Sequence, residues 1–364
     1  MLHGHGLLLE ALRHPENLMA LPAIGCTNVI REARRSDLLG RLASRLEAAG
    51  LMDKIPAAPQ AHLKSARILA GAQHAEVRRE VHQIWRVLRP LGVQLVLLKG
   101  AAYNHAGLSA AAGRMFSDID LLVPKADLAA VEAALMLNGW ATTHHSAYDQ
   151  HYYRKWMHEL PPMQHMMRGT VIDVHHAILP ETARLKPDSK KLLNAIVPVT
   201  NMPGLYVLGP TDMVLHSMAH LFCNEEFSHG LRDLTDIDAL LREFGQRPAF
   251  WTELAHRAVE LDLQRPLYYG LQQTGALLEC PVPDAVMRQV DAAAPPAPIR
   301  QLMNRLWRKV LATAPPGRGN GPSSIAELLL LIRAHWLRMP PWLLGFHLCT
   351  KLFRCGEIGR VKTP

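Results

Sequence analysis

Two aspartates stand one residue apart in the stretch RMFSDIDLLV, which spans residues 114–123 and is otherwise mostly apolar. If this stretch is a β-strand, Asp118 and Asp120 point to the same face, because successive side chains of a strand alternate between its two faces. Two carboxylates held so close repel each other, and burial raises their pKa values. A divalent cation removes the repulsion, and Mg²⁺ is commonly held by one or two carboxylates together with substrate phosphates. The pair therefore indicates a magnesium site, with Mn²⁺ as an alternative, unless Asp118 caps a turn and Asp120 lies solvated at a strand edge.

A third acidic residue occurs in another alternating stretch, VIDVH, at residues 171–175. The alternation puts Asp173 and His175 on one face of a predicted strand. On a neighbouring strand, Asp173 would complete a site with Asp118 and Asp120. Two metal ions held by three carboxylates suit an in-line displacement at phosphorus. His175 either orients Asp173 or contacts a phosphate, unless its role is structural.

Cationic and small residues stand near these acids in the sequence. Lys99 and Gly100 end the apolar run VQLVLLKG, where a tight backbone turn and a positive charge can meet phosphates. Arg114 and Ser117 flank the aspartates and can do the same. We therefore expect these four residues to bind the nucleotide, with Lys99 and Arg114 neutralising phosphate charge.

Histidines are abundant, with twenty in the chain, but their irregular spacing does not favour a zinc site. His158 and Glu159 precede a Pro-Pro corner, which is either a substrate-side loop or a plain connection between strands. His216 and His220 lie four residues apart on a predicted helix and so share a face, either in the core or along a groove. We retain His158 and His220, with His175, as candidates for contacting or orienting the substrate.

The chain divides into four regions by the pattern of apolar residues along its sequence. Residues 1–90 carry apolar residues at helical spacing and are predicted to be helical. Residues 91–205 mix short apolar runs with an amphipathic segment and are predicted to form the core. Residues 206–290 return to helical spacing and are expected to pack on that core. Residues 291–364 are expected to be a linker followed by apolar, basic helices.

Short apolar or aromatic runs in the core predict its strands. We expect strands within residues 93–100, 114–124, 151–157, 163–168 and 170–176. The amphipathic segment KADLAAVEAALMLNGW is predicted to be a helix that ends at Asn138-Gly139. The predicted fold class is therefore α+β, a mixed sheet with helices, flanked by helical regions at both ends.

The C-terminal segment 325–354 is strongly apolar and interspersed with basic residues. Ser324 and Glu327 form the sequence signature of a capping box, so a helix is expected to start there. The segment is either a helix pair packed on the main body or a contact surface for a membrane periphery or a partner protein.

Composition limits the class of protein. The formal net charge of +8 suits an anionic partner such as a nucleotide or an acidic membrane surface, or reflects a basic proteome. The five cysteines are scattered and odd in number, which predicts reduced thiols. The N-terminus lacks the pattern of a signal peptide, and no uncharged apolar stretch reaches about 18 residues. We therefore expect a cytoplasmic protein, with association at the membrane periphery as the alternative.

The ordered motifs LVLLKGAA, GRMFSDIDLLV and VIDVHH resemble those of the nucleotidyltransferase superfamily of DNA polymerase β. The chain is most similar to a bacterial branch of largely uncharacterised nucleotidyltransferases. The resemblance extends over the helical motifs LHSMAHLF and LRDLTDIDALL and covers roughly residues 90–245. The ordered set of motifs is specific, whereas the aspartate pair alone is not.

This resemblance implies a polymerase β-like mixed sheet and a magnesium ion held by aspartates. Transferred residue by residue, it makes Asp118 and Asp120 metal ligands and Asp173 a third carboxylate that helps to activate the attacking hydroxyl. Gly100 then corresponds to the glycine that approaches the nucleotide phosphates.

The function expected from these features is transfer of a nucleoside monophosphate from an NTP, expected to be ATP, to an acceptor hydroxyl or phosphate. The acceptor is a small molecule, a peptide or a protein, because no nucleic-acid-binding module is recognisable. One alternative is transfer of the γ-phosphoryl group by the same metal site, which would make the protein a kinase. Another is a scaffold that binds nucleotide or a partner without catalysis.

Overall fold

The computed structural model describes residues 5–143, 153, 156–312 and 324–340. Within them, seven strands form a mixed sheet in the order β3-β4-β5-β2-β1-β7-β6. β2 pairs in parallel with β5 and antiparallel with β1, which in turn pairs in parallel with β7. The strands are β1 (Leu95–Leu97), β2 (Ile119–Leu122), β3 (Trp140–Thr142), β4 (Met163–His165), β5 (Val171–His175), β6 (Val197–Pro198) and β7 (Leu205–Val207).

The centre of the sheet is buried on both faces. Every residue of β1 and β2 is buried, and this explains why both strands are near-continuous apolar runs. Asp120 is the polar exception within β2, so its charge needs a partner inside the protein.

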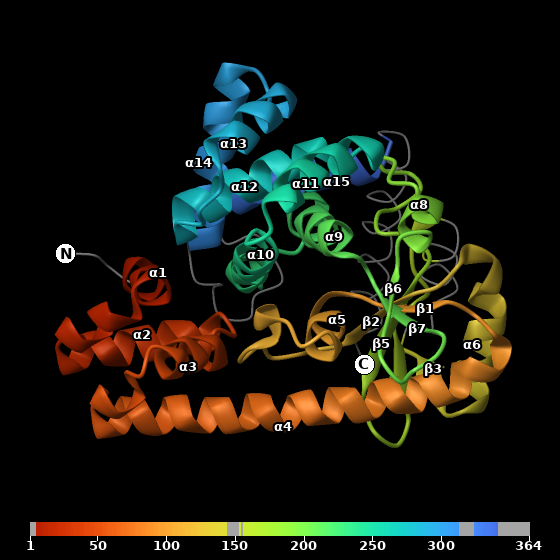
Figure 1. Ribbon diagram of the computed structural model, residues 1–364, viewed down its shortest axis with the longest axis horizontal. Coiled ribbons are helices and arrows are strands. Elements are labelled where there is room, and N and C mark those ends of the chain that lie inside the picture. Colours follow the sequence, from red (N-terminus) through yellow and green to blue (C-terminus); the bar gives the residue numbers. More distant parts are fainter. Residues whose placement is uncertain (1–4, 144–152, 154–155, 313–323, 341–364) are drawn as a thin grey trace, which may run out of the picture.

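Helices before the sheet form an arm along one side of the molecule. Its elements are α1 (His5–Arg13), η1 (Pro15–Ala20), α2 (Ala23–Arg35), α3 (Leu39–Ala48), η2 (Met52–Lys54), α4 (Ala57–Leu88) and η3 (Arg89–Leu91). The 32 residues of α4 form a rod of about 48 Å, which runs from the N-terminal helices to the sheet (Figure 1). Trp85, near the end of α4, donates a hydrogen bond to the carbonyl oxygen of Pro203 at 3.0 Å, which fixes the rod to the segment before β7.

Short helices connect the strands. They are α5 (Lys99–His105), η4 (Ser109–Ala111), η5 (Lys125–Asp127), α6 (Leu128–Leu137) and α8 (Ser189–Leu193). α5 follows β1 directly and packs against η4, α4 and β2. The turn between β1 and α5 therefore holds Lys99 close to the aspartates of β2.

The helices that follow the sheet in the sequence form a bundle next to it (Figure 1). They are α9 (Pro210–Cys223), α10 (Gly230–Phe244), α11 (Pro248–Glu260), α12 (Gln264–Leu278), α13 (Asp284–Val290), η6 (Asp291–Ala293), α14 (Ala297–Ala312) and α15 (Ile325–Arg338). α9 is buried along almost its whole length between α10, α11 and α12. One hydrophobic cluster extends from Leu8 to Leu330, so the arm, the sheet and the bundle share a continuous core.

Most predicted elements are present. The helical regions and the strands around residues 93–100, 114–124, 163–168 and 170–176 are confirmed. The strand predicted at 151–157 is wrong where it is described, because Tyr153 and Trp156 are helical and Met157 lies in a bend, while residues 151, 152, 154 and 155 lie outside the described residues. The short strands β3, β6 and β7 were not predicted. The division into four regions stays a prediction.

The C-terminal helix begins as predicted. The Ser324 Oγ accepts a hydrogen bond from the Glu327 backbone N–H at 3.2 Å. One face of α15 is buried through Ala326, Leu330 and Ala334, and the opposite face leaves apolar side chains exposed. Residues 341–354 of the predicted contact segment lie outside the described residues. Among the described helices, none has the length and apolar character needed to cross a membrane.

Candidate active site

The parallel pairing of β2 with β5 brings together acids that are far apart in the sequence. Asp120 lies directly opposite Asp173, so their side chains leave the sheet on the same side. Asp118 stands just before β2 and lines the same cavity. The cavity measures about 480 Å³. Residues that line it include Lys99, Arg114, Ser117, Asp118, Asp120, His158, Glu159, Asp173, His175, His220, Arg232, Asp233 and Arg338.

Asp120 is the most strongly compensated of the three acids. Its Oδ1 accepts hydrogen bonds from the Lys99 Nζ at 2.7 Å and from the His175 Nε2 at 3.1 Å. Burial alone would raise the pKa of Asp120, but Lys99 and His175 outweigh burial and hold that pKa well below its usual range. Asp120 is therefore a carboxylate at neutral pH.

Lys99 is positioned by an unusual backbone conformation. Its φ is +45°, in the left-handed region, at the point where the chain turns from β1 into α5. Burial favours the neutral amine, but Asp120 and Asp118 outweigh it and raise the pKa of Lys99. The predicted phosphate-binding cation is thus charged and paired with Asp120.

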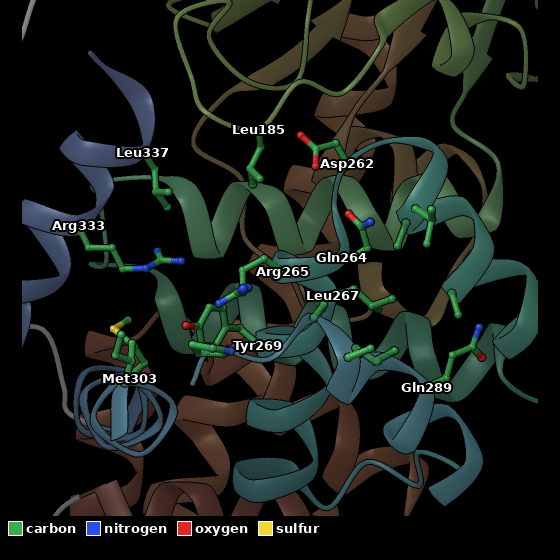
Figure 2. A pocket seen from close by; sticks show the side chains of 18 of the residues that line it. Leu185, Asp262, Gln264, Arg265, Leu267, Tyr269, Gln289, Met303, Arg333 and Leu337 are labelled. Atoms are coloured by element: carbon green, nitrogen blue, oxygen red, sulfur yellow. The ribbon is translucent and has the colours of Figure 1, made fainter. Parts of the chain in front are cut away.

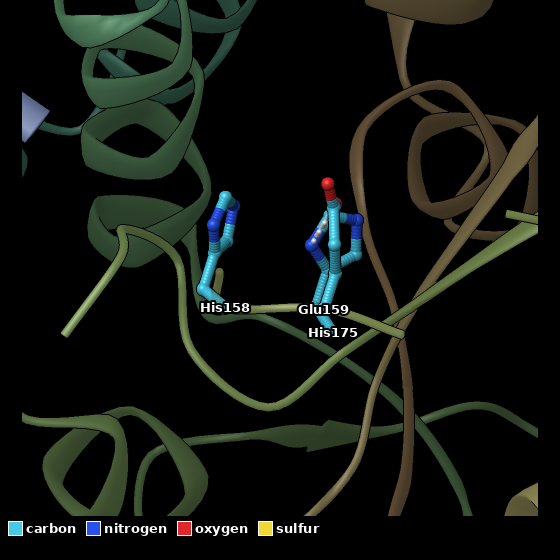
Figure 3. Close-up of side chains that lie close together, drawn as sticks. All are labelled: His158, Glu159 and His175. Carbon is cyan, nitrogen blue, oxygen red and sulfur yellow. Dashed lines mark ion pairs between the residues drawn. The ribbon is translucent and has the colours of Figure 1, made fainter. Parts of the chain in front are cut away.

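Both ring nitrogens of His175 face a carboxylate. The Nε2 faces Asp120, and the Nδ1 lies 3.1 Å from the Oε2 of Glu159, as the dashed line in Figure 3 marks. Burial would lower the pKa of His175, but Glu159 and Asp120 outweigh it and raise that pKa.

His158 lies alongside His175, with the centroids of the two rings 5.2 Å apart. The buried Nδ1 of His158 has no hydrogen-bond partner among the described residues. Burial and the neighbouring His175 lower the pKa of His158, which is therefore neutral.

Asp173 is the acid that lacks compensation. Its Oδ1 is buried and has no hydrogen-bond partner among the described residues. Burial, followed by repulsion from Asp120, raises the pKa of Asp173 to about 7. Burial and Asp120 also raise the pKa of Asp118, whose Oδ1 accepts a hydrogen bond from the Ser117 Oγ at 2.8 Å. A cation would relieve both acids.

The described residues contain donor sets suited to a metal ion at this point. Ligand atoms of Asp120, Asp173 and His175 lie within 4.8 Å of one another, as do those of His158, Glu159 and His175. The first set, with two carboxylates, suits Mg²⁺ or Mn²⁺, whereas the second set, with two imidazoles and one carboxylate, is less suited to Mg²⁺. The unpartnered oxygen of Asp173 shows that the first set fits a cation.

Comparison with protein families shows the class of this protein. A family of uncharacterised nucleotidyltransferases matches residues 22–279, which is more than half of the chain and includes all three aspartates. The chain belongs to this family. It is therefore an enzyme, a transferase of phosphorus-containing groups. A search of curated proteins finds no match to this nucleotidyltransferase.

Arg114 of the nucleotidyltransferase is held in an internal ion pair. Its Nε donates to the Oδ2 of Asp236, on α10, at 2.6 Å. Burial would lower the pKa of Arg114, but Asp236 and Asp233 outweigh it and raise that pKa. The guanidinium also packs over the Phe116 ring, 5.4 Å from its centroid. Arg114 therefore lines the cavity of the nucleotidyltransferase from a fixed position.

Gly100 makes room for that arginine. A Cβ added at Gly100 would lie 2.4 Å from the Nη1 of Arg114 and 2.7 Å from the Cε1 of Phe116. The structure thus gives a packing reason for this glycine, and the proposed approach to phosphates stays a prediction.

His220 lies on the α9 side of the cavity. Its Nε2 is 3.9 Å from the Oδ2 of Asp233, and burial lowers the pKa of His220 to about 3. His216 is buried one turn earlier, and burial lowers its pKa well below the usual range. The structure brings His220 together with the acids, while its predicted role in substrate contact stays a prediction.

Glu159 is the residue of this constellation whose role the sequence did not reveal. The motif HELPP gave only a loop beside a corner, whereas the structure pairs Glu159 with His175 through an isolated antiparallel bridge. A carboxylate next to a candidate histidine in the sequence was the available signal, but the loop conformation that joins it to β5 is not encoded in any periodic pattern.

Proposed function

We propose that this nucleotidyltransferase moves a nucleoside monophosphate from an NTP, with ATP as the expected donor, to an acceptor hydroxyl or phosphate in a reaction that depends on Mg²⁺. Mn²⁺ is expected to support the same reaction in place of Mg²⁺. The observation that carries the proposal is the convergence of Asp118, Asp120 and Asp173 on one cavity, with a buried oxygen of Asp173 left without a partner. The expected acceptor is a small molecule, a peptide or a protein.

The three aspartates would hold the cation, which when bound supplies neutralisation of phosphate charge and polarisation of the phosphoryl oxygens. Lys99 contributes a fixed positive charge beside the same carboxylates. In the reaction, the acceptor oxygen forms a bond to the α-phosphorus and the bond to the pyrophosphate breaks, so that pyrophosphate leaves.

Asp173 is proposed to accept the proton from the attacking hydroxyl. A bound cation would hold Asp173 in its ionised form, which is the form that can accept a proton. His175, held between Glu159 and Asp120, is proposed to fix the orientation of Asp120. In this proposal the sheet is of the polymerase β type and the protein acts in the cytoplasm.

The proposal is tested with purified protein, Mg²⁺ and ATP labelled in parallel at the α- or the γ-phosphate, with a cell extract as the source of acceptors. We expect label to move from the α position only. The variants Asp118→Ala and Asp120→Ala should lose at least about a hundredfold in rate, because changes even in residues behind metal ligands commonly cost tenfold to a hundredfold. Asp284→Ala, an exposed aspartate at the start of α13, is the matched control and should retain the activity.

Other outcomes contradict the proposal in distinct ways. Transfer from the γ position only would make the protein a kinase at the same site. Binding of ATP that depends on Mg²⁺, without transfer of either label, would favour the non-catalytic scaffold.

A further inference from the structure

The helical bundle contains a second cavity, remote from the aspartates. It measures about 750 Å³ and lies between α11, α12, α13, η6, α14 and α15 (Figure 2). Among the described residues, none lines both this cavity and the one with the aspartates. Part of its wall, from Gln289 to Leu337, lies beyond the stretch that matches the nucleotidyltransferase family. The cavity is therefore a feature to be explained apart from phosphorus-group transfer.

The walls of the cavity are mostly apolar. Ala258 and Leu267 are almost completely buried, and Val290 and Met303 contribute further apolar surface from α13 and α14. The volume falls in the range of about 300–1,000 Å³ that small-molecule sites occupy. An apolar ligand would be sheltered from water there.

Two arginines interrupt this apolar lining. Arg333 comes from α15 and points toward the side of the cavity where Arg265 and Tyr269 lie (Figure 2). Its Nη1 donates to the carbonyl oxygen of Phe222 at 2.7 Å, and its guanidinium lies 5.2 Å from the centroid of the Tyr269 ring. These contacts hold the group in place but bring no negative charge to it.

Arg265, on α12, has no hydrogen bond or ion pair among the residues that the structure describes. Burial lowers the pKa of Arg333, and the charge of Arg265 lowers it further, so the two guanidinium groups repel each other. Asp262 is the one carboxylate among the described residues that line the cavity, and its Oδ2 accepts a hydrogen bond from the Lys186 backbone N–H at 2.9 Å. Among the described residues, no ion pair joins Asp262 or any other carboxylate to Arg265 or Arg333, so both guanidinium groups can pair with the anionic group of a ligand.

We propose that this cavity binds a single-chain amphiphile with a carboxylate head group, with the chain against the apolar walls and the carboxylate between Arg265 and Arg333. A guanidinium matches a carboxylate in geometry and donates two parallel hydrogen bonds to it. A carboxylate in this position removes the repulsion between the arginines and fills the hydrogen-bonding capacity of Arg265. The apolar walls select for a hydrocarbon chain and against a small hydrophilic anion.

The test measures binding to the full chain by isothermal titration calorimetry with decanoate, decanol and decyltrimethylammonium as probes. We expect decanoate to bind with one site per chain and at least about tenfold more tightly than decanol, with no binding of the cation. Arg265→Met should weaken decanoate binding at least about tenfold and leave decanol binding unchanged. Arg308→Met is the matched control, because Arg308 is exposed on α14 and does not line the cavity.

A second variant fills the cavity without changing its charge. Ala293→Phe, on η6, should abolish binding of both decanoate and decanol while the circular dichroism spectrum stays unchanged. Equal binding of decanoate and decanol, unchanged binding in Arg265→Met, or no binding to the wild type would each overturn the proposal. Self-association of the wild type that Ala293→Phe abolishes would also overturn it, because a second copy of the chain would then occupy the cavity. None of these outcomes depends on nucleotidyl transfer.

Discussion

Asp173 is predicted to destabilise the metal-free protein while serving the reaction. Its pKa is raised from the usual 3.8 to about 7 by burial and by Asp120. Between these two values the native state holds a proton that the unfolded state has released, so stability falls as the pH rises through this window. Asp173→Asn removes the cost of ionisation. We expect the free energy of unfolding of Asp173→Asn to exceed that of the wild type by an amount that grows by about 1–3 kcal/mol between pH 5 and pH 8.

Urea unfolding followed by circular dichroism in the presence of EDTA measures this advantage. Asp53→Asn is the control, because the side chain of Asp53 is 93% exposed, and its effect should be nearly the same at both pH values. Added Mg²⁺ should stabilise the wild type and not Asp173→Asn. An advantage that does not change with pH would show that Asp173 is ionised in the native state without a penalty.

At the scale of single residues, the sequence predicted which acids gather but not how each is satisfied. Alternation along VIDVH and the spacing of the aspartate pair put the acids on strand faces, and the family resemblance joined Asp173 to Asp118 and Asp120; in the structure all three line one cavity. The partner of Arg114 was not predictable, because Asp236 lies 122 residues further along the chain and no local pattern links them. Which of several nearby charges an arginine meets depends on the packing of whole helices.

At the scale of elements, the turn from β1 into α5 depends on the absence of a side chain at Gly100. A methyl group there would lie 2.4 Å from the Nη1 of Arg114, which cannot withdraw without leaving Asp236. We expect Gly100→Ala to lower the free energy of unfolding by about 1–3 kcal/mol, the usual cost of overpacking. Thermal and urea unfolding measure the change.

Gly71→Ala provides the matched control for this substitution. Gly71 lies within α4 and is exposed, and an added Cβ meets no atom within 4 Å. Alanine is the better helix former, so this variant should gain about 0.5–1 kcal/mol. If Gly100→Ala were as stable as Gly71→Ala, the close packing of α5 against Arg114 would be refuted.

Elements with a long periodic pattern were predictable, whereas short strands were predicted in some cases and missed in others. Apolar residues at helical spacing extend over the 32 residues of α4, and so long a pattern predicts a helix clearly. β6 has only two residues, and its pairing with β7 is a tertiary contact that no local pattern predicts. The aromatic residues around Tyr153 favoured a strand by propensity, yet Tyr153 and Trp156 are helical, because strand propensity depends on having a neighbouring strand to pair with.

At the scale of the whole molecule, buried ion pairs connect the arm, the sheet region and the bundle. Asp236, on α10, accepts hydrogen bonds from Arg41 on α3 and from Arg114 before β2. The Arg41 Nη2 also donates to the carbonyl oxygen of Ala110 at 2.7 Å. Asp238, two residues further along α10, accepts a hydrogen bond from the Arg45 Nη2 on α3 at 3.1 Å. Because these groups are buried, the three parts of the chain are expected to unfold together.

Asp236→Asn tests this expectation, because it leaves two buried guanidinium groups without their carboxylate. We expect the free energy of unfolding to fall by about 3–5 kcal/mol, the usual cost of breaking a buried pair by removing one partner.

Tryptophan fluorescence reports on the arm through Trp85, on the sheet through Trp140 and on the bundle through Trp307, and circular dichroism follows all helices. In the wild type the two probes should give one coincident transition. In Asp236→Asn they should separate, with the arm unfolding at a lower urea concentration than the bundle. Variants that retain only Trp85 or only Trp307 of the seven tryptophans would reveal this order. Glu253→Gln removes the exposed partner of Arg247 and should change the free energy of unfolding by less than about 0.5 kcal/mol. Separate transitions already present in the wild type would mean that the shared core does not make the arm and the bundle one cooperative unit.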